Sequence, residues 1–151
     1  MTSSNTSPLP DWIAEHLRKY LATNGADGHI WNGVPTLLLT TTRRKSGTPQ
    51  QLPLIYGKDG DRYVIVASRG GAPDHPGWYK NLVAQPAVQL QVAADRFAAR
   101  ARSAKGDERT RLWLAMAKIW PAYNEYQAKT SREIPVVVLE RVSAVRGVQN
   151  S

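Results

Sequence analysis

The sequence predicts a mainly β, α+β fold in which about six short strands form a small closed or half-open barrel. Most apolar segments are of strand length and follow one another through hairpin turns, and the helical segments lie before or between them. No Gly-x-Gly-x-x-Gly motif occurs, which argues against a Rossmann fold. Because the chain has 151 residues, we expect a single domain over residues 1–151.

The N-terminal part of the chain predicts a polar tail followed by an amphipathic helix. Residues 1–7 are small and polar and are expected to be disordered, and residues 8–25 are expected to hold the helix and its end. Prolines suit the first turn of this helix, and Gly25 suits its end. Two further helices are expected at residues 76–84 and 107–120. The apolar stripe of the first helix consists of Ile13, Leu17, Tyr20 and Leu21.

The barrel itself is expected to occupy residues 34–141. Asp59-Gly60 predicts a hairpin between the second and third strands. Ala94-Asp95 predicts another tight turn, because apolar and polar residues alternate on both sides of it. The six expected strands cover residues 35–42, 51–57, 62–67, 87–92, 96–103 and 134–141.

The composition narrows the classes of partner. A formal net charge of +8 and a pI near 10.0 imply an acidic partner, which could be nucleic acid, anionic lipid or a phosphorylated or polycarboxylate cofactor. No nucleic-acid-binding motif is present, and His16, His29 and His75 lack the spacing of metal ligands, so we expect neither nucleic acid nor a metal. The absence of cysteine, of a signal peptide and of a long apolar run predicts a cytoplasmic protein.

A cationic loop follows the first expected strand. Arg43, Arg44 and Lys45 are consecutive, and the turn formers Ser46 and Gly47 come directly after them. A strand that delivers three cations into a turn brings fixed positive charge and backbone N–H groups to one point, which favours an anion. A solvated turn with no ligand is the alternative interpretation.

A second strand end carries glycine. Ser68-Arg69-Gly70-Gly71 follows the third expected strand and leads to Trp78. Glycine lacks a Cβ and therefore allows the backbone to lie against a flat ring, although an ordinary turn would also explain the pattern.

Two tyrosines near the C-terminal end of the chain suggest a pocket. Tyr123 and Tyr126 lie three residues apart in a polar turn after Pro121, and polar surroundings are more typical of a pocket wall than of a core. Trp113 and Trp120 stand among apolar residues and are expected to pack in the core.

Several motifs in one order resemble the deazaflavin-dependent nitroreductase and quinone reductase family of actinobacteria, a branch of the split β-barrel flavin-binding proteins. The resemblance runs from about residue 34 to residue 139. Its motifs are Leu38-Leu39-Thr40-Thr41-Thr42, Arg44-Lys45-Ser46-Gly47, Pro49, Pro53, Ser68-Arg69-Gly70-Gly71, Pro76, Trp78-Tyr79, Asn81-Leu82, Pro86, Pro121-x-Tyr123-x-x-Tyr126-Gln127 and Ile134-Pro135-Val136.

The resemblance implies a split β-barrel that binds the 5-deazaflavin coenzyme F420 and transfers a hydride from its reduced form to a quinone, or to a nitroaromatic compound. It implies that Tyr126, Tyr123 and Ser68 face the acceptor. The implied coenzyme-binding residues are Arg43, Arg44, Lys45, Ser46, Gly47, Pro49, Gln50, Pro53, Leu54, Ile55, Ala67, Ser68, Arg69, Gly70, Gly71, Trp78 and Asn81.

Some alternatives stay open at this point. Gln50 replaces an arginine of the nitroreductase branch, so binding of the anionic tail is expected to be weaker or shifted. Ile55 replaces an aromatic residue of the acceptor pocket, which favours quinones over bulky nitroimidazoles. FMN would also offer a phosphate and a flat ring, and a binding module without enzymatic activity would share the site. Membrane association is expected to be weak, because Asp11 and Glu15 offset the cations of the first helix.

Overall fold

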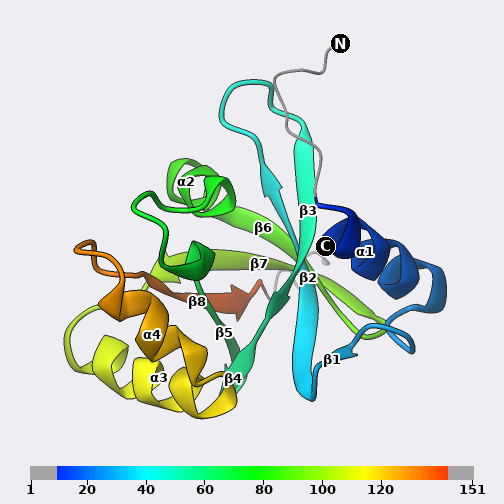
Figure 1. Cartoon of the computed structure of the whole chain (residues 1–151). Helices are drawn as coiled ribbons and strands as arrows, with labels where there is room; N and C mark the ends of the chain where they lie inside the picture. The colour runs from blue at the N-terminus through cyan, green and yellow to red at the C-terminus, as the bar shows by residue number, and fades with distance from the viewer. Residues whose placement is uncertain (1–9, 143–151) are drawn as a thin grey trace.

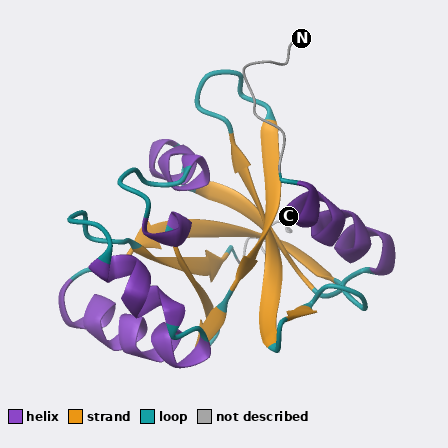
Figure 2. Ribbon diagram, in the orientation of Figure 1, coloured by secondary structure: helices purple, strands orange, loops and turns teal. Residues whose placement is uncertain are grey.

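A curled antiparallel sheet of eight strands forms the centre of the molecule (Figures 1 and 2). The computed structural model describes residues 10–142, so the predicted disordered tail lies outside the described residues. The sheet has the order β1-β2-β6-β7-β8-β5-β4, and β3 also pairs with β2. Its strands are β1 (Ile30–Trp31), β2 (Val34–Thr42), β3 (Pro49–Ile55), β4 (Gly57–Asp59), β5 (Arg62–Val66), β6 (Ala87–Val92), β7 (Asp95–Ser103) and β8 (Val136–Arg141).

The helices cover two separate parts of this sheet. In Figure 1, α1 lies beside β2 and β3, whereas α3 and α4 lie together against the end of the sheet formed by β4, β5 and β8. No helix within residues 10–142 is long and apolar enough to cross a membrane. The helices are α1 (Asp11–Thr23), the short 3₁₀ turn η1 (Arg69–Gly71), α2 (Gly77–Ala84), α3 (Gly106–Ile119) and α4 (Ala122–Ala128).

Strands β5 and β8 are buried on both faces, and this explains their continuous apolar sequences. Ile65 and Leu139 belong to the core inside the curled sheet. Val64 and Val138 point the other way, into a second core beneath α3 and α4. By contrast, β7 alternates buried and exposed residues, because only its inner face packs against a core.

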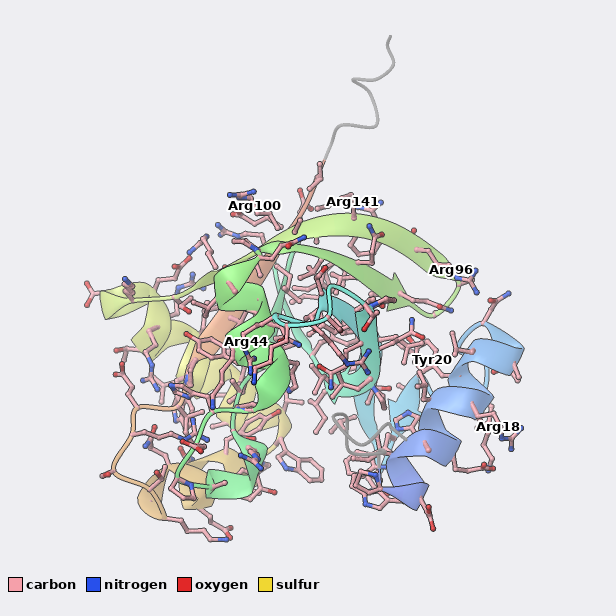
Figure 3. All side chains as sticks on the ribbon, turned by 90° about the horizontal axis from the view of Figure 1, so that it is seen from above. Arg18, Tyr20, Arg44, Arg96, Arg100 and Arg141 are labelled. Carbon is pink, nitrogen blue, oxygen red and sulfur yellow. The ribbon has the colours of Figure 1, made fainter. Side chains whose placement is uncertain are left out.

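A buried tyrosine fixes α1 to the barrel (Figure 3). Tyr20 is fully buried, and its hydroxyl accepts a hydrogen bond from the N–H of Ala93 at 2.7 Å and donates to the carbonyl of Thr36 at 3.0 Å. The helix ends at Asn24 in the left-handed conformation. A Cβ on the following Gly25 would lie 2.5 Å from the Ala93 Cα, so only glycine permits this close approach.

The predicted α+β class and the six longer strands are confirmed, each within two residues at its ends, and the second strand lies two residues earlier than predicted. The Asp59-Gly60 hairpin joins β4 to β5, and the second tight turn lies at Ala93-Ala94, one residue earlier than predicted. The short strands β1 and β4 were not predicted. The segment predicted as a polar turn around Tyr123 is a helix, α4.

Candidate active site

A cleft of ≈ 490 Å³ opens between α1, β3, the loop after β5 and α4. This volume lies within the range of small-molecule sites, and the lining is mainly apolar with a few polar groups, as such sites require. Many predicted site residues come together here although they are far apart in the sequence. They are Pro53, Leu54, Ile55, Ser68, Arg69, Gly70, Trp78, Tyr123 and Tyr126.

The loop after β5 forms one wall of this cleft and has an unusual backbone. Arg69, Gly70 and Gly71 all have positive φ values, of 46°, 62° and 83°. For a residue with a side chain this conformation costs about 1–2 kcal/mol, so neighbouring contacts must hold Arg69 in place. A Cβ on Gly70 would meet no heavy atom within 4 Å, so the Cα of this cleft-lining residue faces open space.

Gly71 has a different role from the one expected. A Cβ at this position would lie 2.6 Å from the carbonyl oxygen of Tyr126. The second glycine therefore allows close approach of α4, whereas the sequence suggested that both glycines accommodate a flat ring. Ala67, which the resemblance placed among the coenzyme-binding residues, is fully buried in the barrel core and does not line the cleft.

The cationic loop joins β2 to β3, and its two arginines are largely bound by the protein itself. Arg43 donates to Thr48 Oγ1 at 3.0 Å and to the Pro49 carbonyl at 2.7 Å. Arg44 lies beside α2 (Figure 3), where it donates to Asn81 Oδ1 at 2.9 Å. Within residues 10–142, Lys45 makes no hydrogen bond or ion pair. Three cations were expected to bind an anion together here, but only Lys45 and the remaining donors of Arg44 are left for it.

Asn81 and Gln50 hold this loop in place. The Asn81 side chain is 4% exposed, and its Nδ2 donates to Gln50 Oε1 at 2.9 Å and to Thr41 Oγ1 at 3.2 Å. Because Arg44 donates to Asn81 Oδ1, the oxygen and the nitrogen of the Asn81 side-chain amide both have partners. Both residues thus position the loop, which itself lies outside the cleft. The predicted residues placed in this hairpin are Arg43, Arg44, Lys45, Ser46, Gly47, Pro49 and Gln50.

The two tyrosines of α4 face the cleft from different depths. Tyr123 is buried, and burial raises the pKa of its hydroxyl above the ordinary value, with Tyr126 adding a smaller effect. Tyr126 is half-buried, and its ring packs edge-on against Tyr123 at 6.2 Å. The hydroxyls of Tyr123, Tyr126 and Ser68 make no hydrogen bond to any residue among 10–142. Tyr126 and Ser68, which line the cleft, therefore have hydroxyls without a partner among the described residues.

The sequence did not reveal an aromatic wall that is formed by α1, β1 and the end of α3. Trp12 stacks on Trp31 with ring centroids 5.7 Å apart, and Trp31 contacts Trp120 at 5.6 Å. His16 stacks on Trp31 as well. Trp120 packs against the second core as predicted, but its ring also lines the cleft. The other lining residues absent from the predicted set are Ile13, Thr36, Leu52, Val66 and Pro76.

One sequence signal could have revealed part of this wall. Trp12 and His16 are four residues apart in α1, so they lie on the same face of the helix, next to Ile13. Trp31 gives no such signal, because β1 has only two residues and therefore no periodicity.

Comparison with known proteins identifies the family of this chain. Residues 12–141 match the family model of the F420H2-dependent quinone reductases. An F420H2-dependent quinone reductase of Mycobacterium tuberculosis strain H37Rv is 45% identical over an alignment of 126 residues, and the match covers 81% of this chain and 85% of the relative.

Solved structures of related proteins have the same fold as this chain. An F420-H2 dependent reductase shares 41% identity with a TM-score of 0.66, covering 70% of this chain and 94% of that chain. A structure described as a domain-swapped dimer shares 38% identity with a TM-score of 0.69, covering 86% of this chain and 98% of that chain. The curled sheet is therefore a split β-barrel, and the chain belongs to the family of F420H2-dependent quinone reductases.

Proposed function

We propose that this protein binds coenzyme F420 in the cleft and catalyses hydride transfer from its reduced form to a quinone. The family match carries this proposal, because residues 12–141 include every side chain that lines the cleft, from Trp12 to Tyr126.

The residues present fit a flat, partly apolar ring. Pro53, Leu54 and Ile55 offer an apolar edge along β3, and Trp78, which is 6% exposed, closes the cleft beneath α2. The open space beside Gly70 allows a ring to lie directly on the backbone. The ring of the coenzyme would therefore lie between β3 and the loop that contains Gly70.

The anionic part of the coenzyme would extend toward positive charge. Arg69 lines the cleft, and Lys45 and the remaining donors of Arg44 lie beyond it in the β2–β3 hairpin. Charge-assisted hydrogen bonds of this kind contribute about 1.5–3 kcal/mol each. They would hold the phosphate and the carboxylates of the tail.

The aromatic wall would hold the acceptor. Trp12, Trp31 and Trp120 line this side of the cleft and contact one another, and an aromatic wall suits a quinone ring. When bound, the reduced coenzyme supplies a hydride. Tyr126 would then donate a hydrogen bond to the acceptor oxygen, where negative charge develops, and Ser68 would approach from the facing loop.

Tyr123 would support this step without transferring a proton. Burial raises the pKa of its hydroxyl, so the group stays neutral throughout the range in which proteins function. It packs against Tyr126 and would keep that ring oriented, while solvent supplies the proton that completes the hydroquinone.

Binding titrations test the identity of the coenzyme. We expect F420 to bind much more tightly than FMN, because FMN has a phosphate but no carboxylate tail for Lys45 to contact. Lys45→Ala should weaken binding of F420 by about 1–3 kcal/mol and change the binding of FMN less. Arg111→Ala, which removes a distant cation, is the control.

Added salt should also weaken binding of F420, because exposed charges are screened over about 10 Å at 0.1 M. Equal affinity for the two flavins in the unmodified protein would contradict the proposal and favour an FMN enzyme.

A further inference from the structure

We propose that Arg132 is a positioning residue that locks the loop Ser68–Ala72 against α4 and thereby fixes the coenzyme-binding loop relative to Tyr126. This inference rests on the proposed function, because the loop is taken to hold the ring and Tyr126 to face the acceptor. Arg132 does not line the cleft itself.

The guanidinium of Arg132 binds three carbonyls around the loop. Its Nε donates to Ala72 at 2.8 Å, its Nη2 to Ser68 at 2.7 Å and its Nη1 to Ala67 at 3.3 Å. These carbonyls lie on both sides of the left-handed residues Arg69–Gly71. A lysine could not reproduce this arrangement, because it is a point charge without a planar fork of donors.

The backbone of Arg132 is itself tied to α4. Gln127 donates from Nε2 to the Arg132 carbonyl at 2.8 Å and accepts at Oε1 from the N–H of Ile134 at 3.0 Å. Gln127 follows Tyr126 directly, and the Tyr126 carbonyl lies against Gly71. The loop and the acceptor side of the cleft are therefore joined through the side chains of Arg132 and Gln127, in addition to the direct contact of Gly71 with α4.

The fourth contact of Arg132 makes the lock sensitive to protonation. Arg132 Nη1 lies 2.9 Å from His75 Nδ1, and since guanidinium can only donate, Nδ1 must accept and His75 must be neutral. Burial lowers the pKa of His75, and the cations Arg132 and Lys80 lower it further, against a smaller opposing effect of Asp74. The ring of Tyr79 packs against the imidazole, with the two centroids 4.9 Å apart.

Hydrogen exchange in the free protein tests the lock without any coenzyme. We expect the amides of residues 68–72 to exchange at least about fivefold faster in Arg132→Met than in the unmodified protein. Arg132→Lys should give an intermediate rate. Arg111→Met is the matched control, because Arg111 donates two hydrogen bonds to Asp59 far from the cleft. Unchanged exchange in this loop would overturn the proposal.

Titration with oxidised F420 tests the consequence for the site. Arg132→Met should raise the dissociation constant at least about fivefold, which is about 1 kcal/mol. A loosened loop with unchanged affinity would show that the lock does not position the coenzyme. If the unmodified protein fails to bind F420, the proposed function is wrong, while the exchange result still stands.

The pH dependence of binding distinguishes the lock from a merely structural arginine. The pKa of His75 lies below the ordinary histidine value of about 6.5, and as the pH falls through it the protonated imidazole can no longer accept from Arg132, so the affinity should fall. In His75→Gln the amide oxygen can accept at every pH, so this part of the decline should vanish. The role of His75 would be overturned if the ratio of the F420 affinity of His75→Gln to that of the unmodified protein stayed constant from about pH 5 to pH 8.

Discussion

Gly70→Val is expected to raise the dissociation constant of oxidised F420 by roughly 100-fold, or about 2.8 kcal/mol. The Gly70 Cα faces open space in the cleft, so a branched side chain would project to where the ring is proposed to lie. Titration by fluorescence or absorbance measures the effect. The fold should survive, because no atom within 4 Å would collide with the new Cβ.

Gly60→Val is the matched control for this substitution. Gly60 has a φ of 63°, against 62° for Gly70, and also has no heavy atom within 4 Å of an added Cβ. Both variants should therefore lose a similar free energy of unfolding from backbone strain. Only Gly70→Val should lose the coenzyme. If both variants bind equally well, the loop after β5 is not the ring site.

Tyr126→Phe is expected to lower turnover with a quinone roughly tenfold, about 1.4 kcal/mol, with little change in coenzyme affinity. The hydroxyl is the proposed hydrogen-bond donor to the acceptor oxygen. Loss of one donor at a well-organised oxyanion site costs about 10²–10³ in kcat. A quinone spreads its charge over the ring, and Ile55 leaves this part of the cleft less filled than an aromatic residue would, so the loss should be smaller.

Tyr79→Phe provides the control for removal of a phenol. The Tyr79 hydroxyl contacts Ser103 Oγ at 2.8 Å and does not line the cleft, so turnover should be unchanged. A collapse of coenzyme affinity in Tyr126→Phe would assign this tyrosine to the coenzyme. No change in either quantity would leave it a packing residue.

The barrel could be predicted from the sequence because its signals are local. Alternation along β7 and the continuous apolar residues of β8 report directly which faces are buried. The Asp59-Gly60 pair reports a hairpin through its turn chemistry. The segment around Tyr123 was misassigned because α4 is short and polar and follows Pro121, which marks a break more clearly than a new helix.

The parts of the site that depend on contacts between distant residues could not be predicted. The sequence shows that Arg43 and Arg44 are cationic, but not that Thr48, Asn81 and neighbouring carbonyls already bind them. Likewise, nothing local distinguishes Arg132 from a surface arginine. Its partners lie 57 to 65 positions earlier in the chain.

Oxidation of reduced F420 by a quinone under anaerobic conditions tests the central proposal most directly. The protein is mixed with reduced coenzyme, a quinone is added, and the absorbance of the coenzyme is followed. We expect one oxidised coenzyme for each quinone reduced, at a rate far above that without protein. If the coenzyme binds but is not oxidised faster than in solution, the protein is a carrier and the proposed catalytic function is wrong.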